Sequence, residues 1–78
     1  MPDLTLYSTD HCSLCDALLD ALLSTPQAGG FRLQVHDITA DGELFDQYAL
    51  RVPVLISDGR EYTGTADPAL LGAWLESL

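Results

Sequence analysis

The first forty residues alternate between strand-type and helix-type patterns, and this order restricts the fold more than any other feature of the sequence. Residues Leu4–Tyr7 form a short apolar run, and the next three residues, "STD", supply turn and capping chemistry. Residues 12–23 then carry apolar side chains at helical spacing, and residues 31–38 ("FRLQVHDI") alternate as a half-buried edge strand does. A strand, helix and strand in this order predict two parallel strands joined by a right-handed crossover.

The apolar positions of these segments define the expected core faces. In the first helix the stripe is Leu14, Ala17, Leu18, Ala21 and Leu22. In the following strand the buried side is Phe31, Leu33 and Val35. The loop "STPQAGG" between them ends the helix, because Pro26 cannot continue it.

The second half of the chain predicts a helix, a hairpin and a final helix. Residues 41–50 form the helix, with Leu44, Phe45 and Tyr48 on one side. "VPVLIS" (52–57) and "REYTG" (60–64) flank Asp58-Gly59, a strong hairpin signal, so these two strands are antiparallel. Asp67 as N-cap and Pro68 in the first turn begin the last helix. Its apolar face is Leu70, Leu71, Trp74, Leu75 and Leu78.

The predicted order is therefore βαβαββα, an α/β fold with a four-stranded mixed sheet flanked by three helices. At 78 residues, of which 47% are hydrophobic and 19% charged, residues 1–78 form one globular domain, because too little chain remains for a second core. No exposed apolar patch is evident in the sequence, so a monomer is expected.

The charge balance excludes several classes of partner. Twelve acidic residues oppose three arginines, giving a net charge of −9, whereas nucleic acids and anionic membranes bind clusters of basic residues. The acids either keep a small domain soluble or meet a basic protein partner. With neither a secretory signal nor a run long enough to span a bilayer, a cytoplasmic location is expected.

Cys12 and Cys15 are the chain's two cysteines, and they lie at the junction between the first strand and the first helix. Three roles compete for such a pair: a redox dithiol, half of a metal site, or a structural staple. A staple closing so short a loop adds only about 2 kcal/mol by the chain-entropy relation. A metal site needs three or four ligands, and neither His11 nor His36 is well placed to complete one, so no metal is expected in a single chain.

Three segments, "YSTDHCSLCDALL", "RVPVLI" and the "DG" hairpin followed by "YTGTADPALL", resemble the thioredoxin fold in its short, glutaredoxin-like form over essentially the whole chain. The resemblance implies a thiol–disulfide oxidoreductase in cell redox homeostasis. Cys12 would attack a substrate disulfide and Cys15 would resolve the mixed disulfide. The substrate would be a disulfide-containing protein or glutathione, and no bound cofactor is implied.

The resemblance also implies a substrate groove. Pro53 would be cis and face the dithiol, and Val52 would offer its backbone N–H and C=O to an extended substrate. His11, Thr65 and Asp67 occupy positions that contact glutathione in related proteins, although the Gly64–Asp67 stretch matches that pattern only in part. A basic residue is missing before Cys12, so Arg51 either supplies a compensating charge or is a solvated surface residue. Glutathione remains open as a co-substrate.

Two hypotheses follow for the dithiol. The helix start and a protonated His11 favour a Cys12 thiolate while Asp10 and Asp16 oppose it, which predicts a pKa below the free-thiol value of about 8.5 but well above about 3.5. The alternative to an enzyme is a thioredoxin-like binding or adaptor module whose dithiol is regulatory or incidental.

Overall fold

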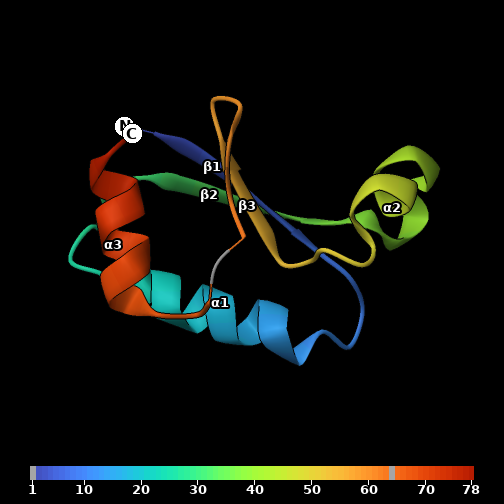
Figure 1. The fold of residues 1–78 in the computed structure, drawn as a ribbon, viewed down its shortest axis with the longest axis horizontal. Helices are drawn as coiled ribbons and strands as arrows, with labels where there is room; N and C mark the ends of the chain where they lie inside the picture. Colours follow the sequence, from blue (N-terminus) through green and yellow to red (C-terminus); the bar gives the residue numbers. More distant parts are fainter. Residues whose placement is uncertain (1, 64) are drawn as a thin grey trace.

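The strands assemble into one mixed sheet (Figure 1). In this computed structural model, which describes residues 2–63 and 65–78, the strand order is β2-β1-β3-β4. The strands are β1 (Asp3–Ser8), β2 (Arg32–Asp37), β3 (Val54–Ser57) and β4 (Arg60–Tyr62). β1 is parallel to β2 and antiparallel to β3, which is in turn antiparallel to β4. The predicted four-stranded mixed sheet is confirmed, and the edge strand expected at residues 31–38 is Arg32–Asp37 in the structure; Gly64 lies outside the described residues.

The turn between β3 and β4 has the predicted hairpin geometry. Asp58 and Gly59 have φ values of 50° and 79°. Two consecutive positive φ values match the twist of a two-residue hairpin loop, and Asp-Gly tolerates them well. This local signal alone therefore brings β4 back alongside β3.

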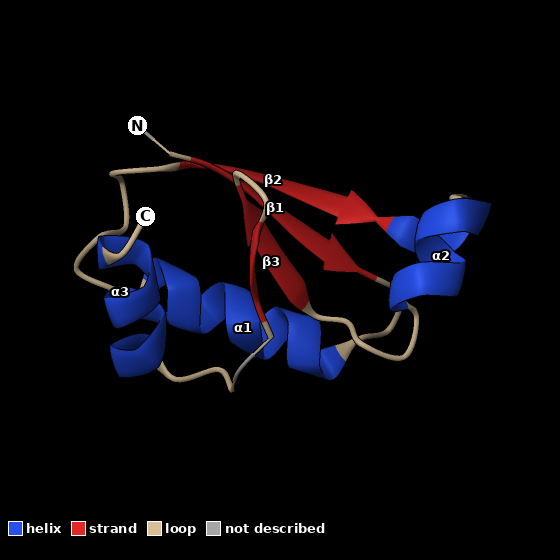
Figure 2. Cartoon of the chain, turned by 45° about the horizontal axis from the view of Figure 1, so that its top comes forward, coloured by secondary structure: helices blue, strands red, loops and turns tan. Residues whose placement is uncertain are grey.

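Two helices, α1 (Ser13–Leu23) and α3 (Pro68–Glu76), cover one face of the sheet (Figure 2). The core between them and the sheet is mostly leucine. Its fully buried members include Leu4, Leu6, Leu18, Leu22, Leu55 and Leu71. Because full burial of a leucine contributes about 1.5–3 kcal/mol, this layer fixes α1 against β1 and so fixes the position of the cysteines at its start.

The buried side of α1 differs from the predicted stripe by about one residue. Cys15, Leu18 and Leu22 point into the core, whereas Leu14 is 67% exposed and Ala17 is exposed. The spacing i, i+3, i+7 from Cys15 defines the core face, which leaves Leu14 on its flank. The prediction for these two residues was wrong because Cys15 is itself a core residue.

Two further expectations of burial were wrong. Val35 is 50% exposed although its partner in register, Leu6, is buried. β2 is an edge strand, so Val35 lies at the margin of the face that the helices cover. In α3, Asp67 caps the helix by accepting a hydrogen bond from the Ala69 N–H (2.9 Å), as predicted, but Leu70 and Leu78 are 53% and 39% exposed.

The second helix, α2 (Gly42–Tyr48), is shorter than the predicted range of 41–50. It lies beyond the carboxyl ends of β1 and β2 (Figures 1 and 2), and none of its residues is buried. Phe45 is 40% exposed and Leu50 fully so. An unpredicted 3-10 turn, η1 (Ile38–Ala40), precedes it and inserts the fully buried Ile38 instead. The loop from α2 to β3 then returns toward α1.

Candidate functional site

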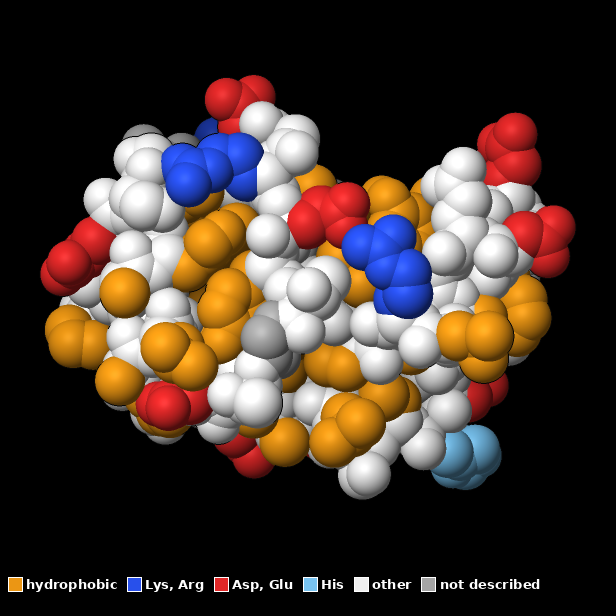
Figure 3. All heavy atoms as spheres, in the orientation of Figure 1, with side chains coloured by type: hydrophobic (Ala, Val, Ile, Leu, Met, Phe, Trp, Pro, Cys, Tyr) orange, Lys and Arg blue, Asp and Glu red, His pale blue; other side chains and the backbone are white. Residues whose placement is uncertain are grey.

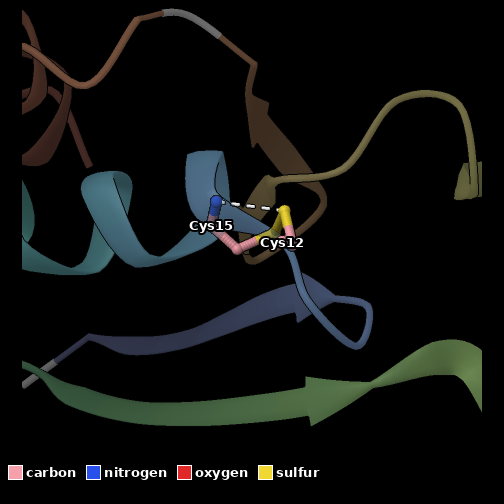
Figure 4. The surroundings of a disulfide bond; sticks show 2 residues. All are labelled: Cys12 and Cys15. Carbon is pink, nitrogen blue, oxygen red and sulfur yellow. Dashed lines mark hydrogen bonds between the residues drawn. A yellow bond between two sulfur atoms is a disulfide. The ribbon is translucent and has the colours of Figure 1, made fainter.

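Cys12 occupies the N-cap position of α1. Its backbone is extended (φ −96°, ψ 98°), and its Sγ accepts a hydrogen bond of 3.1 Å from the Cys15 backbone N–H (Figure 4). The first turn of a helix leaves N–H groups without a partner inside the helix, and here one of them donates its hydrogen bond to the sulfur of Cys12. The same position stabilises negative charge on that sulfur.

Cys12 and Cys15 are joined by a disulfide, and their Cα atoms lie 5.2 Å apart. The two sulfurs differ in access, because Cys12 is half-buried whereas Cys15 is only 4% exposed. A partner can therefore reach Cys12 from solvent, while Cys15 is reached mainly through Cys12. This asymmetry suits a pair in which one thiol reacts with a partner and the other with its neighbour.

A groove of about 360 Å³ lies beside the start of α1. Its lining comes from α1, the loop before β3 and the connection after β4: Leu14, Leu18, Arg51, Val52, Pro53, Thr63, Thr65 and Ala66. The Val52–Pro53 peptide is cis, as the resemblance implied. The structure thus brings together four of the predicted substrate-binding residues.

The sequence missed four residues of this lining: Leu14, Leu18, Thr63 and Ala66. Leu14 was assigned to the core, and its exposure became visible only once the rotation of α1 was known. Thr63 and Ala66 carry no distinctive sequence pattern.

His11 and Asp67 are not among the lining residues. His11 is exposed in the loop that leads to Cys12, with a positive φ of 55°. Asp67 uses its carboxylate to cap α3. Their predicted contact with glutathione therefore has no support from the shape of the groove.

The backbone N–H of Val52 is already engaged. It donates to the carbonyl oxygen of Tyr48 (3.0 Å), at the end of α2. The expectation that Val52 offers this N–H to an extended substrate does not hold in this structure.

Arg51 is an exposed surface residue whose charge is paired. Its Nη2 forms an ion pair with Oε1 of Glu61 (2.6 Å), and its Cζ lies 5.1 Å from the centre of the Tyr48 ring. The interpretation as a surface arginine therefore agrees with its exposure, although β4 places an acidic partner, ten residues away, beside it; a compensating charge for a substrate stays a prediction.

The connection from β4 to α3 is held by Tyr62. Its hydroxyl donates to the carbonyl oxygen of Thr65 (2.6 Å), and the Asp67 N–H donates to the same oxygen (2.8 Å). Burial raises the pKa of the Tyr62 hydroxyl above its usual value, and the Asp67 carboxylate raises it further. This wall of the groove therefore depends on a buried, neutral phenol.

An acidic group lies at the end of β2. Hydrogen bonds from the side chain and backbone of Thr39 hold the pKa of Asp37 below its usual value, with smaller contributions in the same direction from Asp10 and His36. Asp37 is thus ionised at neutral pH, next in register to Ser8 at the end of β1. Among the described residues, no three His, Cys, Asp or Glu side chains cluster as metal ligands would.

Residues 3–76 match the family described as Glutaredoxin-like domain (DUF836). The chain belongs to this family. Among solved structures, this glutaredoxin-like chain is similar to the X. campestris target protein XcR50, with 42% identity, a TM-score of 0.81 and coverage of 96% of this chain and 97% of that one. No significant match is found among curated proteins.

More distant structures share only the fold of this glutaredoxin-like chain. Trxlp from Edwardsiella tarda is 20% identical, with a TM-score of 0.61 over 95% of this chain and 81% of that one. The thioredoxin Mala s 13 of Malassezia sympodialis is 18% identical, with a TM-score of 0.60 over 97% and 75%. The thioredoxin-like fold inferred from the sequence is confirmed. None of the described helices has the length and apolar character needed to cross a bilayer.

Proposed function

We propose that this chain is a thiol–disulfide oxidoreductase that exchanges its Cys12–Cys15 dithiol with substrate disulfides. The observation that carries the proposal is the contrast between the two sulfurs: Cys12 is accessible at the helix N-cap, and Cys15 is buried one turn away and bonded to it. Family membership and the cis Val52–Pro53 peptide beside the groove support the same activity.

The reaction begins from the reduced protein. The Cys12 thiolate attacks one sulfur of a substrate disulfide, and the Cys12–substrate bond forms as the substrate bond breaks. The first thiol leaves as a thiolate and takes a proton from solvent. Cys15 then loses its proton and attacks the Cys12 sulfur, which releases the second thiol and forms the Cys12–Cys15 disulfide. The substrate gains two electrons and the protein loses two, so a thiol reductant, such as glutathione or a reduced dithiol protein, must return them.

The environment of the pair favours each step. The Cys15 N–H and the helix start stabilise the attacking thiolate, and also the Cys12 thiolate when it is the leaving group during reduction of the protein. Burial of Cys15 keeps it from competing substrates until the mixed disulfide forms. The exposed Leu14 and the half-buried Pro53 offer apolar surface to the substrate chain.

Two single substitutions test this function. Pre-reduced protein freed of reductant is mixed with a peptide disulfide, and the products are counted by alkylation and mass measurement. Cys12→Ser abolishes turnover, whereas Cys15→Ser stops at a stable mixed disulfide on Cys12. A wild-type protein that leaves the peptide disulfide unreduced would contradict the proposal. If both variants then still bind a protein partner as the wild type does, the adaptor interpretation replaces the enzyme.

A further inference from the structure

Glu61 and Arg51 form an ion pair at the edge of the groove that lies beside the start of α1. We propose that this pair determines which substrates are preferred according to their charge. Because Glu61 already binds the guanidinium of Arg51, the chain favours disulfides of uncharged or basic thiols over those of anionic thiols. This inference rests on the proposed oxidoreductase function and adds its substrate class. Glu61 is then a specificity-determining residue, although it is not one of the groove-lining residues.

The guanidinium of Arg51 is held on two sides. Glu61 accepts its Nη2 hydrogen bond at 2.6 Å, and the Tyr48 ring lies 5.1 Å from its Cζ. The Arg51 backbone N–H also donates to the Tyr48 carbonyl oxygen (2.8 Å). The side chains of Arg51 and Glu61 are 49% and 35% exposed, so the pair meets solvent and contributes little to folding. Its effect is expected mainly in binding.

No other arginine replaces this charge. The sequence holds three basic residues, all of them arginines. Arg32 pairs with Asp3 (2.8 Å) in the outer part of the sheet, and Arg60 donates to the carbonyl oxygen and hydroxyl of Ser77 (2.6 and 3.1 Å). On the face shown in Figure 3, basic side chains are sparse while apolar ones are exposed in several groups. Every arginine of the chain is therefore already engaged.

A second contact for an anionic peptide is also occupied. The Val52 N–H donates to Tyr48 at 3.0 Å, so this donor does not face an incoming carboxylate or carbonyl. With a net charge of −9, the chain repels anions at longer range as well. What the groove presents is apolar surface from Leu14 and Pro53 and the hydroxyls of two threonines.

Glu61 acts as a competitor built into the chain. A substrate carboxylate can bind Arg51 only by displacing the Glu61 carboxylate, whose effective concentration near the guanidinium is high because both belong to one fold. Replacing Glu61 with glutamine keeps the shape of the side chain and removes its charge. Arg51 then becomes available to anionic substrates while the dithiol is unchanged.

The test compares two substrates that differ mainly in net charge. Glutathione disulfide and its bis(glycine methyl ester) have the same reacting sulfurs, but the ester lacks two carboxylates. Oxidation of pre-reduced protein is measured with each, and the ratio of the two rate constants, acid over ester, is the readout. In the wild type this ratio lies below one. In Glu61→Gln it rises about three- to tenfold, the scale of one partly exposed, charge-assisted hydrogen bond.

Two controls separate local release of Arg51 from a general change of charge. Asp58→Asn removes one acidic charge from the tip of the same hairpin, away from the groove, and leaves the ratio within about 1.5-fold of wild type. The double variant Arg51→Gln/Glu61→Gln loses the gain. An unchanged ratio in Glu61→Gln, or an equal rise in Asp58→Asn, overturns the inference.

Adding salt to the wild type is a second measurement, and it needs no variant that could fold differently. Salt should raise the rate of reaction with the acid and leave the rate with the ester unchanged. The absence of this difference also contradicts the inference. Failure of the wild type to react even with the ester, whose net charge is zero, instead contradicts the oxidoreductase function itself.

Discussion

The backbone N–H of Cys15 donates a hydrogen bond of 3.1 Å to Sγ of Cys12, across the first turn of α1. The neighbouring N–H groups of this turn and the helix dipole add positive potential at the same sulfur. Cys12 is also the more accessible of the two sulfurs. Its reactivity is therefore determined by the start of a helix, and the first prediction follows from this position.

In the reduced protein, Cys12 should react with iodoacetamide before Cys15, with a midpoint below the free-thiol pKa of about 8.5. The hydrogen bond and the helix dipole favour the thiolate, whereas the surrounding acidic residues limit the shift. The rate of alkylation measured from pH 5 to pH 10 gives this midpoint. Protein unfolded in urea is the matched control and should titrate near the ordinary value. A native midpoint above the unfolded one would refute the prediction.

Replacing Leu14 with serine should slow the reaction with an apolar peptide disulfide and leave stability nearly unchanged. Leu14 is 67% exposed and lines the groove, so it has apolar surface to give to a substrate. Partial burial of a leucine is worth about 1 kcal/mol, which corresponds to about a fivefold lower rate constant. Leu23→Ser is the matched control, because Leu23 is 58% exposed at the other end of α1. Equal loss of rate in both variants would remove Leu14 from the binding surface.

Leu22→Ala should destabilise the protein by about 2–5 kcal/mol, because Leu22 is fully buried between α1 and the sheet and its removal leaves a cavity. Total stabilities of domains this small are about 4–12 kcal/mol, so the loss is a large fraction of the whole. Urea unfolding gives the difference directly. Leu23→Ala, one residue along but exposed, should change stability by less than about 0.5 kcal/mol.

Tyr62→Phe should lower stability by about 0.5–1.5 kcal/mol at neutral pH, because it removes the hydroxyl that donates to Thr65. The wild type should also lose stability above pH 10. The pKa of Tyr62 is higher in the folded state than its unfolded value of about 10, so the folded state binds more protons there and stability falls as pH rises through that range. Urea unfolding between pH 8 and pH 11 measures both effects. In Tyr62→Phe this part of the alkaline loss disappears, and an identical pH dependence in the two proteins would exclude Tyr62 as its source.

Several features of this protein were determined by its sequence alone. The Asp58-Gly59 turn, the Asp67 cap of α3 and the position of Cys12 at the start of α1 all agree with the structure. Each depends on a few neighbouring residues whose backbone preferences and hydrogen bonds are satisfied locally. The order of strands and helices follows from the same local patterns, and with the rule of right-handed crossovers it is enough to give the fold.

Tertiary structure alone decided which side chains surround the dithiol. Burial of Cys15 rather than Leu14 depends on how α1 is rotated against the sheet, and a pattern of apolar residues locates that rotation only to within about one residue. The pairing of Arg51 with Glu61 depends on β4 folding back beside the loop before β3. Neither is a local property, because each depends on contacts between segments that meet only when the core has formed.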